Sequence, residues 1–340
     1  MKVLILVDWE TQPSDDTQFE GKDEATKLGM EYQVIQALRD QGHAIEVLSF
    51  GPDILQTMTT LREKAPDLVF NLTEHVGGDR RKDAHIAAML ELLGIPFTGT
   101  STIGLMLCRD KGTCKRVLGY HHIRLPAFEE LQVGRTKPAA RLKFPMIVKP
   151  MYEDGSDGIS LSSIVRTAEE LQERVSMVHE RMKQSALCEE FIEGREIYVA
   201  ILGNERLQAL PPRELHFGKT DEGGPTIATA RVKWNEKYRK KWGISYGHAE
   251  LDPALEKKVS HFSKRVFRLL NMRDYGRIDL RITPQNEVVF LEANPNPNLG
   301  NDEDVAEAAR KAGIEYAPLI DRIVQQAAKR RPATTQAKQG

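Results

Sequence analysis

Apolar runs and amphipathic stretches alternate along the first hundred residues of the chain. Apolar runs that suit strands buried on both faces occur at residues 3–7, 45–48 and 67–71. Apolar side chains at helical spacing lie between and after these runs, and they predict helices that end near Gly42, Lys64 and Gly94. Strand and helix therefore alternate, and this part of the chain is expected to form an open, mostly parallel α/β sheet.

The rest of the chain has longer and less regular elements. Thr167, with Glu170 three residues later, has the spacing of a capping box at the start of a helix. The stretch 211–248 is polar, aromatic and rich in glycine, and its length is typical of a functional lid. The end, 330–340, is polar and is expected to be disordered. The apolar pattern predicts strands at 144–150, 187–192, 196–202, 277–282 and 287–291, and helices at 167–183, 253–270, 305–312 and 316–329.

Length and composition narrow the possible classes of protein. A chain of 340 residues is long enough for two or three domains. Its 48 Lys and Arg against 49 Asp and Glu give a net charge of −1, which disfavours binding to nucleic acid or to an anionic membrane. Three cysteines without CxxC spacing fit a reducing compartment, so a cytoplasmic location is expected. No apolar run approaches the roughly 20 residues of a membrane span.

The strongest candidate for chemistry is a pair of strands that carry carboxylates near their ends. Residues two apart on a strand share a face, so Arg277 shares one with Asp279, and Glu292 shares one with Asn294. If the strands pair, Asp279, Glu292 and Asn294 form an all-oxygen cluster, which Mg²⁺ prefers and usually shares with nucleotide phosphates. Arg277 would offset charge on an oxyanion or a phosphoryl group. The alternative is a solvated strand face, which the apolar strand interiors disfavour.

Two further segments place polar residues where they could meet a nucleotide. Lys149 ends an apolar strand and precedes the short glycine-rich loop 153–158. Backbone N–H groups of such a loop and the lysine ammonium can hold a phosphate, although a turn without a ligand fits the pattern equally well. The acidic segment 188–196 could present backbone groups to an adenine and Glu196 to ribose hydroxyls, but surface charge is the simpler interpretation.

Together these segments resemble the ATP-grasp superfamily, and in particular its D-alanine–D-alanine ligase branch. The resemblance runs from about Phe70 to Ile323, and it also rests on residues 71–78 (NLTEHVGG), 92–99 (LLGIPFTG) and 109–111 (RDK). It implies a two-subdomain ATP-grasp fold of α+β character behind the N-terminal parallel α/β sheet. The implied units are an N-terminal α/β domain at 1–107, a small ATP-grasp subdomain at 108–186, a C-terminal catalytic subdomain at 187–328 and a disordered tail at 329–340.

The resemblance also implies roles for individual residues. Arg277 would stabilise a tetrahedral intermediate, and Ser156 would lie in the mobile loop over the γ-phosphate of ATP. Lys233 resembles the second phosphate lysine of the lid, with Lys237 as a rival, and the lid is expected to order on nucleotide binding. His75 resembles a residue near the first substrate, although a structural histidine fits as well. The other implied contacts are ATP phosphates at Lys111 and Lys149, adenine at Glu189, Phe191 and Ile192, ribose at Glu196, two Mg²⁺ ions (or Mn²⁺) at Asp279, Glu292 and Asn294, and substrate at Asn298 and Asp302.

The chain also departs from the ligase pattern. Segment 295–304 is acidic where the second D-alanine carboxylate would bind, and Trp234 replaces the tyrosine that would follow the lid lysine. The N-terminal glycine-rich loop and its glutamate are missing, with Glu24 as a weak candidate for the latter. The expected function is an ATP-dependent carboxylate–amine ligase that forms an amide through an acyl phosphate, on an amino acid or small peptide, with a homodimer as one option. The alternatives are a D-alanine–D-alanine ligase and a non-catalytic ATP-binding scaffold.

Asp302, Glu303 and Asp304 predict a preference for an acceptor with a cationic group. A bare carboxylate facing these side chains would be repelled by roughly 1 kcal/mol per close pair even at water-like screening. The alternative is that these acids cap a helix that begins near Val305, because carboxylates suit a helix N-terminus.

Overall fold

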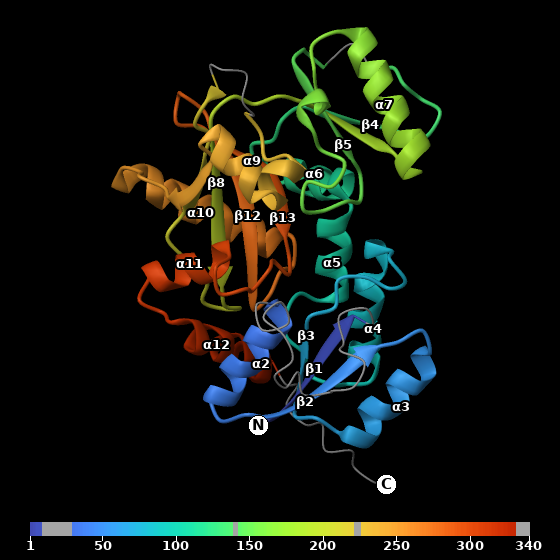
Figure 1. Ribbon diagram of the computed structural model, residues 1–340, viewed down its shortest axis with the longest axis vertical. Coiled ribbons are helices and arrows are strands. Elements are labelled where there is room, and N and C mark those ends of the chain that lie inside the picture. Colours follow the sequence, from blue (N-terminus) through green and yellow to red (C-terminus); the bar gives the residue numbers. More distant parts are fainter. Residues whose placement is uncertain (9–28, 139–141, 221–225, 331–340) are drawn as a thin grey trace.

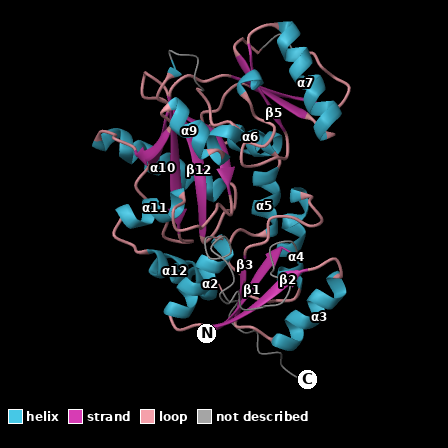
Figure 2. Ribbon diagram, in the orientation of Figure 1, coloured by secondary structure: helices cyan, strands magenta, loops and turns pink. Residues whose placement is uncertain are grey.

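The computed structural model describes residues 1–8, 29–138, 142–220 and 226–330. These residues form three sheets with helices packed around them (Figures 1 and 2). In Figure 1 the N-terminal sheet lies at the bottom, the largest sheet lies above it, and the smaller antiparallel sheet lies at the upper right. Across these ranges no helix is both long enough and apolar enough to cross a membrane.

The N-terminal sheet is parallel, as the sequence predicted, with the strand order β2–β1–β3. In its central strand β1, residues 3–7 are fully buried because helices cover both faces. A short 3₁₀ helix, Arg80–Lys82, precedes α4. The elements are β1 (Lys2–Asp8), α2 (Met30–Asp40), β2 (Ala44–Phe50), α3 (Ile54–Lys64), β3 (Leu68–Asn71), α4 (Asp83–Leu92) and α5 (Thr102–Arg109).

The small sheet is antiparallel, with the order β4–β7–β5–β6, and α7 packs on one face. The Thr167 side chain caps α7 by accepting a hydrogen bond from the Glu170 amide, whereas Glu170 accepts one from the Arg166 amide, so only half of the predicted capping box forms. Because β7 pairs with β4 and β5, we propose that the small subdomain extends past the predicted limit at 186, to Glu190. The elements are β4 (Phe128–Leu131), β5 (Met146–Pro150), a 3₁₀ turn (Leu161–Ser163), β6 (Ile164–Val165), α7 (Ala168–Met182) and β7 (Ala186–Glu190).

The large sheet has the order β11–β10–β8–β12–β13, with β9 beside β8. Helices α6 and α10 pack on one of its faces. The last helix, α12, packs against α2 and β3, so it closes the core of the N-terminal sheet. The elements are α6 (Lys111–Tyr120), β8 (Arg195–Leu202), β9 (Gln208–Ala209), β10 (Arg213–His216), α8 (Ala230–Trp234), α9 (Glu236–Trp242), β11 (Ser245–His248), α10 (Pro253–Leu269), β12 (Tyr275–Ile282), β13 (Val288–Asn294), α11 (Asp304–Lys311) and α12 (Tyr316–Lys329).

The stretch 211–248 is more regular than the sequence predicted. Strands β10 and β11 form an edge of the large sheet, and α8 and α9 lie between them along the chain. Leu215, Val232 and Ile244 pack with Tyr198 in one small core. These apolar residues are too widely spaced in the sequence to give a helical or alternating pattern, which is why the stretch reads as a loop.

Candidate active site

One face of the large sheet carries a row of polar side chains at matching register. Asp279 of β12 is the direct partner of Glu292 on β13 and, on its other side, of Tyr198 on β8. Tyr198 in turn lies opposite Arg213 of β10. Directly paired residues point to the same face of a sheet, so Arg213, Tyr198, Asp279 and Glu292 form one row across four strands.

The predicted metal residues lie together at one end of this row. Arg277 holds Asp279 through two hydrogen bonds, from Nε to Oδ1 at 2.8 Å and from Nη2 to Oδ2 at 3.0 Å. Asn294 donates from Nδ2 to Asp279 Oδ2 at 3.1 Å, which leaves its amide oxygen for another partner. Lys111 Nζ lies 2.8 Å from Glu292 Oε1. Cationic groups therefore hold both carboxylates in place before any ligand is bound.

Burial and neighbouring charges together shift the pKa values of Glu292 and Asp279 in opposite directions. Burial alone would raise the pKa of Glu292, but the ammonium groups of Lys111 and Lys233 outweigh it and lower the pKa to about 2. At Asp279 burial is the larger effect, and it raises the pKa in spite of the Arg277 guanidinium. Glu292 is therefore the more firmly ionised of the two.

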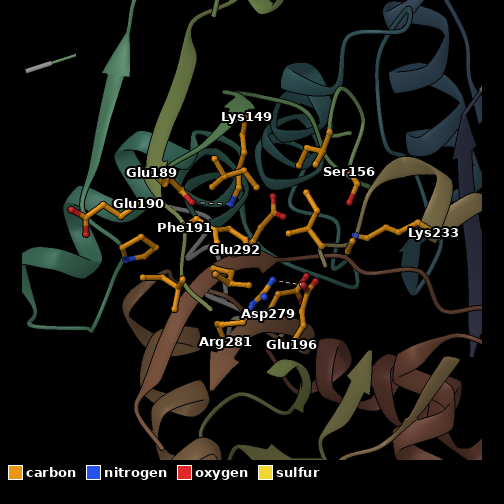
Figure 3. A pocket seen from close by; sticks show the side chains of 17 residues that line it. Lys149, Ser156, Glu189, Glu190, Phe191, Glu196, Lys233, Asp279, Arg281 and Glu292 are labelled. Carbon is orange, nitrogen blue, oxygen red and sulfur yellow. Dashed lines mark hydrogen bonds and ion pairs between the residues drawn. The ribbon is translucent and has the colours of Figure 1, made fainter. Parts of the chain in front are cut away.

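A cavity between the small and the large sheets holds most of the predicted nucleotide residues (Figure 3). We call it the inter-sheet cavity. On its small-sheet side, Lys149 Nζ contacts Glu189 Oε2 at 2.8 Å, and Lys115 Nζ contacts Glu189 Oε1 at 2.9 Å. Burial would raise the pKa of Glu189, but these two lysines lower it. The predicted residues that line the cavity are Lys149, Ser156, Glu189, Phe191, Ile192, Glu196, Lys233, Asp279 and Glu292.

The large-sheet side of this cavity is a buried network around Glu196. Arg281 Nη2 donates to Glu196 Oε2 at 2.7 Å, and the Tyr198 hydroxyl donates to Oε1 at 2.8 Å. Figure 3 shows the Arg281–Glu196 pair beside Asp279, opposite the Lys149–Glu189 pair. Glu196 is thus fixed as a hydrogen-bond acceptor at the wall of the cavity, where the predicted ribose contact would lie.

Helix α8 connects this cavity to a second one. Lys233 lines both cavities, whereas Lys237 lines neither, so the geometry favours Lys233 as the lid lysine. The next residue, Trp234, donates its indole N–H to the Gly155 carbonyl oxygen at 3.1 Å, which ties α8 to the glycine-rich loop. In that loop Ser156 has a φ of 64°, a left-handed conformation that a serine rarely adopts, and its buried side chain lines the inter-sheet cavity.

The second cavity, which we call the strand-end cavity, lies past the ends of β12 and β13. Two of the predicted substrate residues, Asn298 and Asp302, line it together with Arg277 and Asn294. His75 does not line it, although its neighbour Glu74 does. The His75 Nε2 atom lies 3.7 Å from Asp8 Oδ2. The weak candidate Glu24 lies outside the described residues.

The three acidic residues after β13 differ in their surroundings. Asp304 is paired with two arginines, at 3.2 Å from Arg277 Nη1 and 3.5 Å from Arg213 Nε. Glu303 is the N-cap residue of α11, yet its side chain makes no capping hydrogen bond. Burial raises the pKa of Glu303, and Asp302 is exposed. The repulsive charge expected from three acids is therefore smaller than predicted, and neither Glu303 nor Asp304 caps the helix through its side chain.

The sequence of this chain is similar to the sequences of known ligases. The sequence model described as the C-terminus of D-Ala-D-Ala ligase matches residues 117–325, more than half of the chain. A D-alanine–D-alanine ligase of Aquifex aeolicus is 31% identical over 292 residues, which cover 86% of this chain and 92% of that protein. The chain belongs to the D-alanine–D-alanine ligase family. Another relative, the uncharacterised protein y4sG of Sinorhizobium fredii, is 33% identical over 303 residues that cover 87% of each chain.

Solved structures of family members share the fold. The D-alanine–D-alanine ligase of Bacillus anthracis in complex with ATP matches with a TM-score of 0.73 at 21% identity, over 97% of this chain and 99% of that chain. The VanG D-Ala:D-Ser ligase of Enterococcus faecalis matches with a TM-score of 0.70 at 19% identity, over 96% and 99%. The predicted family resemblance and the predicted ATP-grasp fold are both confirmed.

Three buried basic residues near the site were not predicted from the sequence. Lys115 lies one helical turn after Lys111 on α6, and Arg281 lies two residues after Asp279 on β12, so helix and strand periodicity could have identified both. Arg213 gave no such signal, because β10 was not expected as a strand. All three are more than nine-tenths buried.

The oxygen ligands fit Mg²⁺ only as part of a shared coordination shell. In the described parts of the chain, no group of three or more His, Cys, Asp or Glu side chains is close enough to hold a metal ion alone. Asp279 and Glu292 are direct partners, and beside them the Asn294 amide oxygen has no hydrogen-bond partner among the residues that the structure describes. This donor set is typical of Mg²⁺ that completes its shell with nucleotide phosphates.

Proposed function

We propose that this chain joins the carboxylate of one small molecule to the amine of another at the expense of ATP. The observation that carries the proposal is the junction of the two cavities. Lys233 lines both of them. Asp279 and Glu292 line the inter-sheet cavity, and Arg277, which donates two hydrogen bonds to Asp279, lines the strand-end cavity. A nucleotide in the inter-sheet cavity would therefore present its terminal phosphate to a carboxylate in the strand-end cavity.

The residues at the junction suit transfer of a phosphoryl group to a carboxylate. A carboxylate is a poor electrophile until one oxygen becomes a phosphate leaving group. Lys149 and Lys233 would balance the charge of the phosphates during transfer, and bound Mg²⁺ at Asp279, Glu292 and Asn294 would supply further charge neutralisation. Arg277 would then stabilise the oxyanion that forms when the amine attacks the acyl phosphate. The contact between Trp234 and Gly155 closes α8 over the site and would keep water away from that intermediate.

We further propose that the substrates are amino acids or small peptides, and that at least one of them differs from D-alanine. Asp302 and Glu303 line the strand-end cavity without an ion pair among the described residues, and they would favour a cationic group on the acceptor. The names of the relatives support a second candidate, ligation of D-alanine to itself. A purely nucleotide-binding scaffold is disfavoured, because Arg277, Asp279 and Glu292 are all present, with Arg277 hydrogen-bonded to Asp279 and Asp279 paired with Glu292.

A screen for ATP-dependent phosphate release tests these alternatives. The protein would be incubated with ATP, Mg²⁺ and pairs of D- and L-amino acids or dipeptides, and the condensed product would be identified by mass spectrometry. Release that requires two different compounds supports the proposal. Full activity with D-alanine alone would establish the second candidate, and nucleotide binding without release in any combination would contradict both.

A further inference from the structure

Arg213 is a buried cation whose side chain donates no hydrogen bond to any other described residue. It lies in β10, its side chain is more than nine-tenths buried, and it lines the strand-end cavity. Within the described residues, its Nε atom has no hydrogen-bond partner. The two nearest carboxylate oxygens lie at 3.5 Å from Nε, in Asp304, and at 3.9 Å from Nη1, in Glu307. Both distances exceed the range of about 2.7–3.2 Å that is usual for an N–H···O hydrogen bond.

Asp304 and Glu307, the two acids nearest Arg213, each accept a hydrogen bond from another arginine. Asp304 accepts a hydrogen bond from Arg277 Nη1 at 3.2 Å, and Glu307 is held by Arg310. They offset part of the charge of Arg213 without using its donor groups. Leaving a buried donor unsatisfied costs free energy, and a guanidinium presents five N–H donors in a fork that matches a carboxylate. The guanidinium of Arg213 therefore has donor groups available for an acceptor that binds in the strand-end cavity.

Arg213 lies near the proposed reaction centre. It lies in the same cross-strand row as Asp279 with only Tyr198 between them, which places their backbones about 10 Å apart at the usual strand spacing. Arg213 and Arg277 also contact opposite oxygens of the one Asp304 carboxylate. A small molecule that reacts beside Arg277 can therefore reach Arg213 with a second group.

From these contacts we infer that Arg213 binds a carboxylate of the substrate that is not itself phosphorylated. The inference rests on the proposed ligase function, and it deepens that function by assigning an anion-recognising residue to the strand-end cavity. It also refines the expected substrate chemistry, because Arg213 would take the anionic group while Glu303 and Asp302 lie at the same cavity for a cationic one. An amino acid carries both charges.

Equilibrium binding of matched acids and amides tests this assignment without requiring turnover. The probes are D-alanine and D-alaninamide, glycine and glycinamide, and L-lysine and L-lysinamide, titrated by calorimetry into the full chain with Mg²⁺ and a non-hydrolysable ATP analogue. The variants are Arg213→Gln and Arg213→Lys. The matched control is Arg195→Gln, which removes the same charge from the adjacent strand β8, where Arg195 pairs with Glu214 outside both cavities.

The wild-type chain should bind at least one acid about tenfold more tightly than its amide, which corresponds to one charge-assisted hydrogen bond. Arg213→Gln should reduce this ratio to near one, Arg213→Lys should retain part of it, and Arg195→Gln should leave it unchanged. An unchanged ratio in Arg213→Gln, or equal binding of acid and amide by the wild type in every pair, would overturn the inference. If Arg213→Gln does not fold, the ratio in Arg213→Lys decides.

Phosphate release with the same probes separates this inference from the ligase function. Discrimination between acid and amide without release by any pair would contradict the ligase proposal and leave Arg213 as an anion-binding residue. Where release occurs, an amide can serve only as the amine, since it has no carboxylate to phosphorylate. A higher KM confined to the amine substrate in Arg213→Gln supports the inference. A higher KM confined to the acyl substrate would overturn it, because each acid probe has a single carboxylate and the acyl substrate is phosphorylated on that group.

Discussion

Two carboxylates of the site are each paired with lysines of other elements. Glu292 of β13 contacts Lys111 of α6, and Glu189 of β7 contacts Lys149 of β5 as well as Lys115 of α6. These pairs are at least three-quarters buried, where the loss of one partner leaves an uncompensated charge. Lys111 and Lys149, which would serve the ATP phosphates, thus also offset the buried charges of Glu292 and Glu189.

Replacement of Glu292 by glutamine should lower Mg²⁺-dependent ATP turnover at least about a hundredfold, because a neutral amide cannot supply the charge that a metal ligand must. Steady-state phosphate release, with circular dichroism to confirm folding, measures the effect. Glu287→Gln is the control, since Glu287 precedes the same strand and is half exposed outside both cavities. Near-normal activity in a folded Glu292→Gln protein would show that Glu292 is not a metal ligand.

The low pKa of Glu292 also predicts how stability depends on acid. Its pKa is about 2 in the folded chain and 4.5 ordinarily, so between these values the unfolded chain binds more protons. The contribution of Glu292 to the free energy of unfolding is present above pH 4.5 and is lost as the pH falls toward 2. Urea denaturation at several pH values from about 3 to 6 should show a shallower pH dependence in Glu292→Gln than in the wild type. Equal slopes would contradict the assigned pKa.

At the scale of elements, α8 links the two sheets that enclose the inter-sheet cavity. The Trp234 indole donates to the Gly155 carbonyl oxygen, and the Ala230 amide donates to the Ile159 carbonyl oxygen at 3.3 Å. Both acceptors lie in the small subdomain, whereas α8 follows β10 of the large sheet. Ordering of this region by a nucleotide remains a prediction, and these two contacts, which are present in the structure, would hold the region closed.

Trp234→Phe should therefore weaken the binding of ATP more than it weakens the fold. Loss of one hydrogen bond of about 1 kcal/mol predicts a KM for ATP roughly three- to tenfold higher. The melting temperature should change little, because Trp234 is 65% exposed. Trp242→Phe is the control, since its indole nitrogen has no hydrogen-bond partner among the described residues. An unchanged KM for ATP in Trp234→Phe would show that this contact does not hold the lid.

The sequence predicted those elements whose periodicity is regular, together with the site residues that lie on them. Strand alternation predicted that Asp279 shares a face with Arg277 and Glu292 with Asn294, and the structure adds that the two strands pair with Asp279 opposite Glu292. Strand β10, only four residues long and preceded by two prolines, has no such pattern, and Arg213 was missed with it. Nor does a sequence show that Arg213 and Arg277 neutralise Asp304, since that contact joins residues distant along the chain.

For the molecule as a whole, one buried carboxylate joins segments from all along the chain. Asp274, which is fully buried, accepts hydrogen bonds from the Gly99 amide and the Asn204 side-chain amide, both at 2.9 Å. Arg330, just after α12, donates to Asp274 and to the Phe97 carbonyl oxygen. The loop after the N-terminal sheet, the large sheet and the last helix are thus held at a single point.

Removal of the arginine should destabilise all three segments together. Arg330→Ala should lower the free energy of unfolding by about 2–3 kcal/mol, somewhat less than for a fully buried pair, because Asp274 keeps two other donors. Lys329→Ala, at the exposed last residue of α12, should change the free energy of unfolding by no more than about 0.5 kcal/mol. Urea unfolding followed by tryptophan fluorescence measures both. Equal midpoints for the two variants would show that the Arg330 contact contributes nothing.

The packing of α12 on the N-terminal sheet has a consequence for synthesis on the ribosome. His43, just before β2, forms a hydrogen bond at 2.8 Å with Asp321 of α12, which lies 278 residues further along the chain. At the usual speed of translation, on the order of tens of seconds separate the emergence of these two residues. During that interval one apolar face of the first sheet is covered by α2 alone, and such a partly exposed surface is prone to aggregation and to capture by chaperones. The earliest part of the protein to be made is thus among the last to become fully folded.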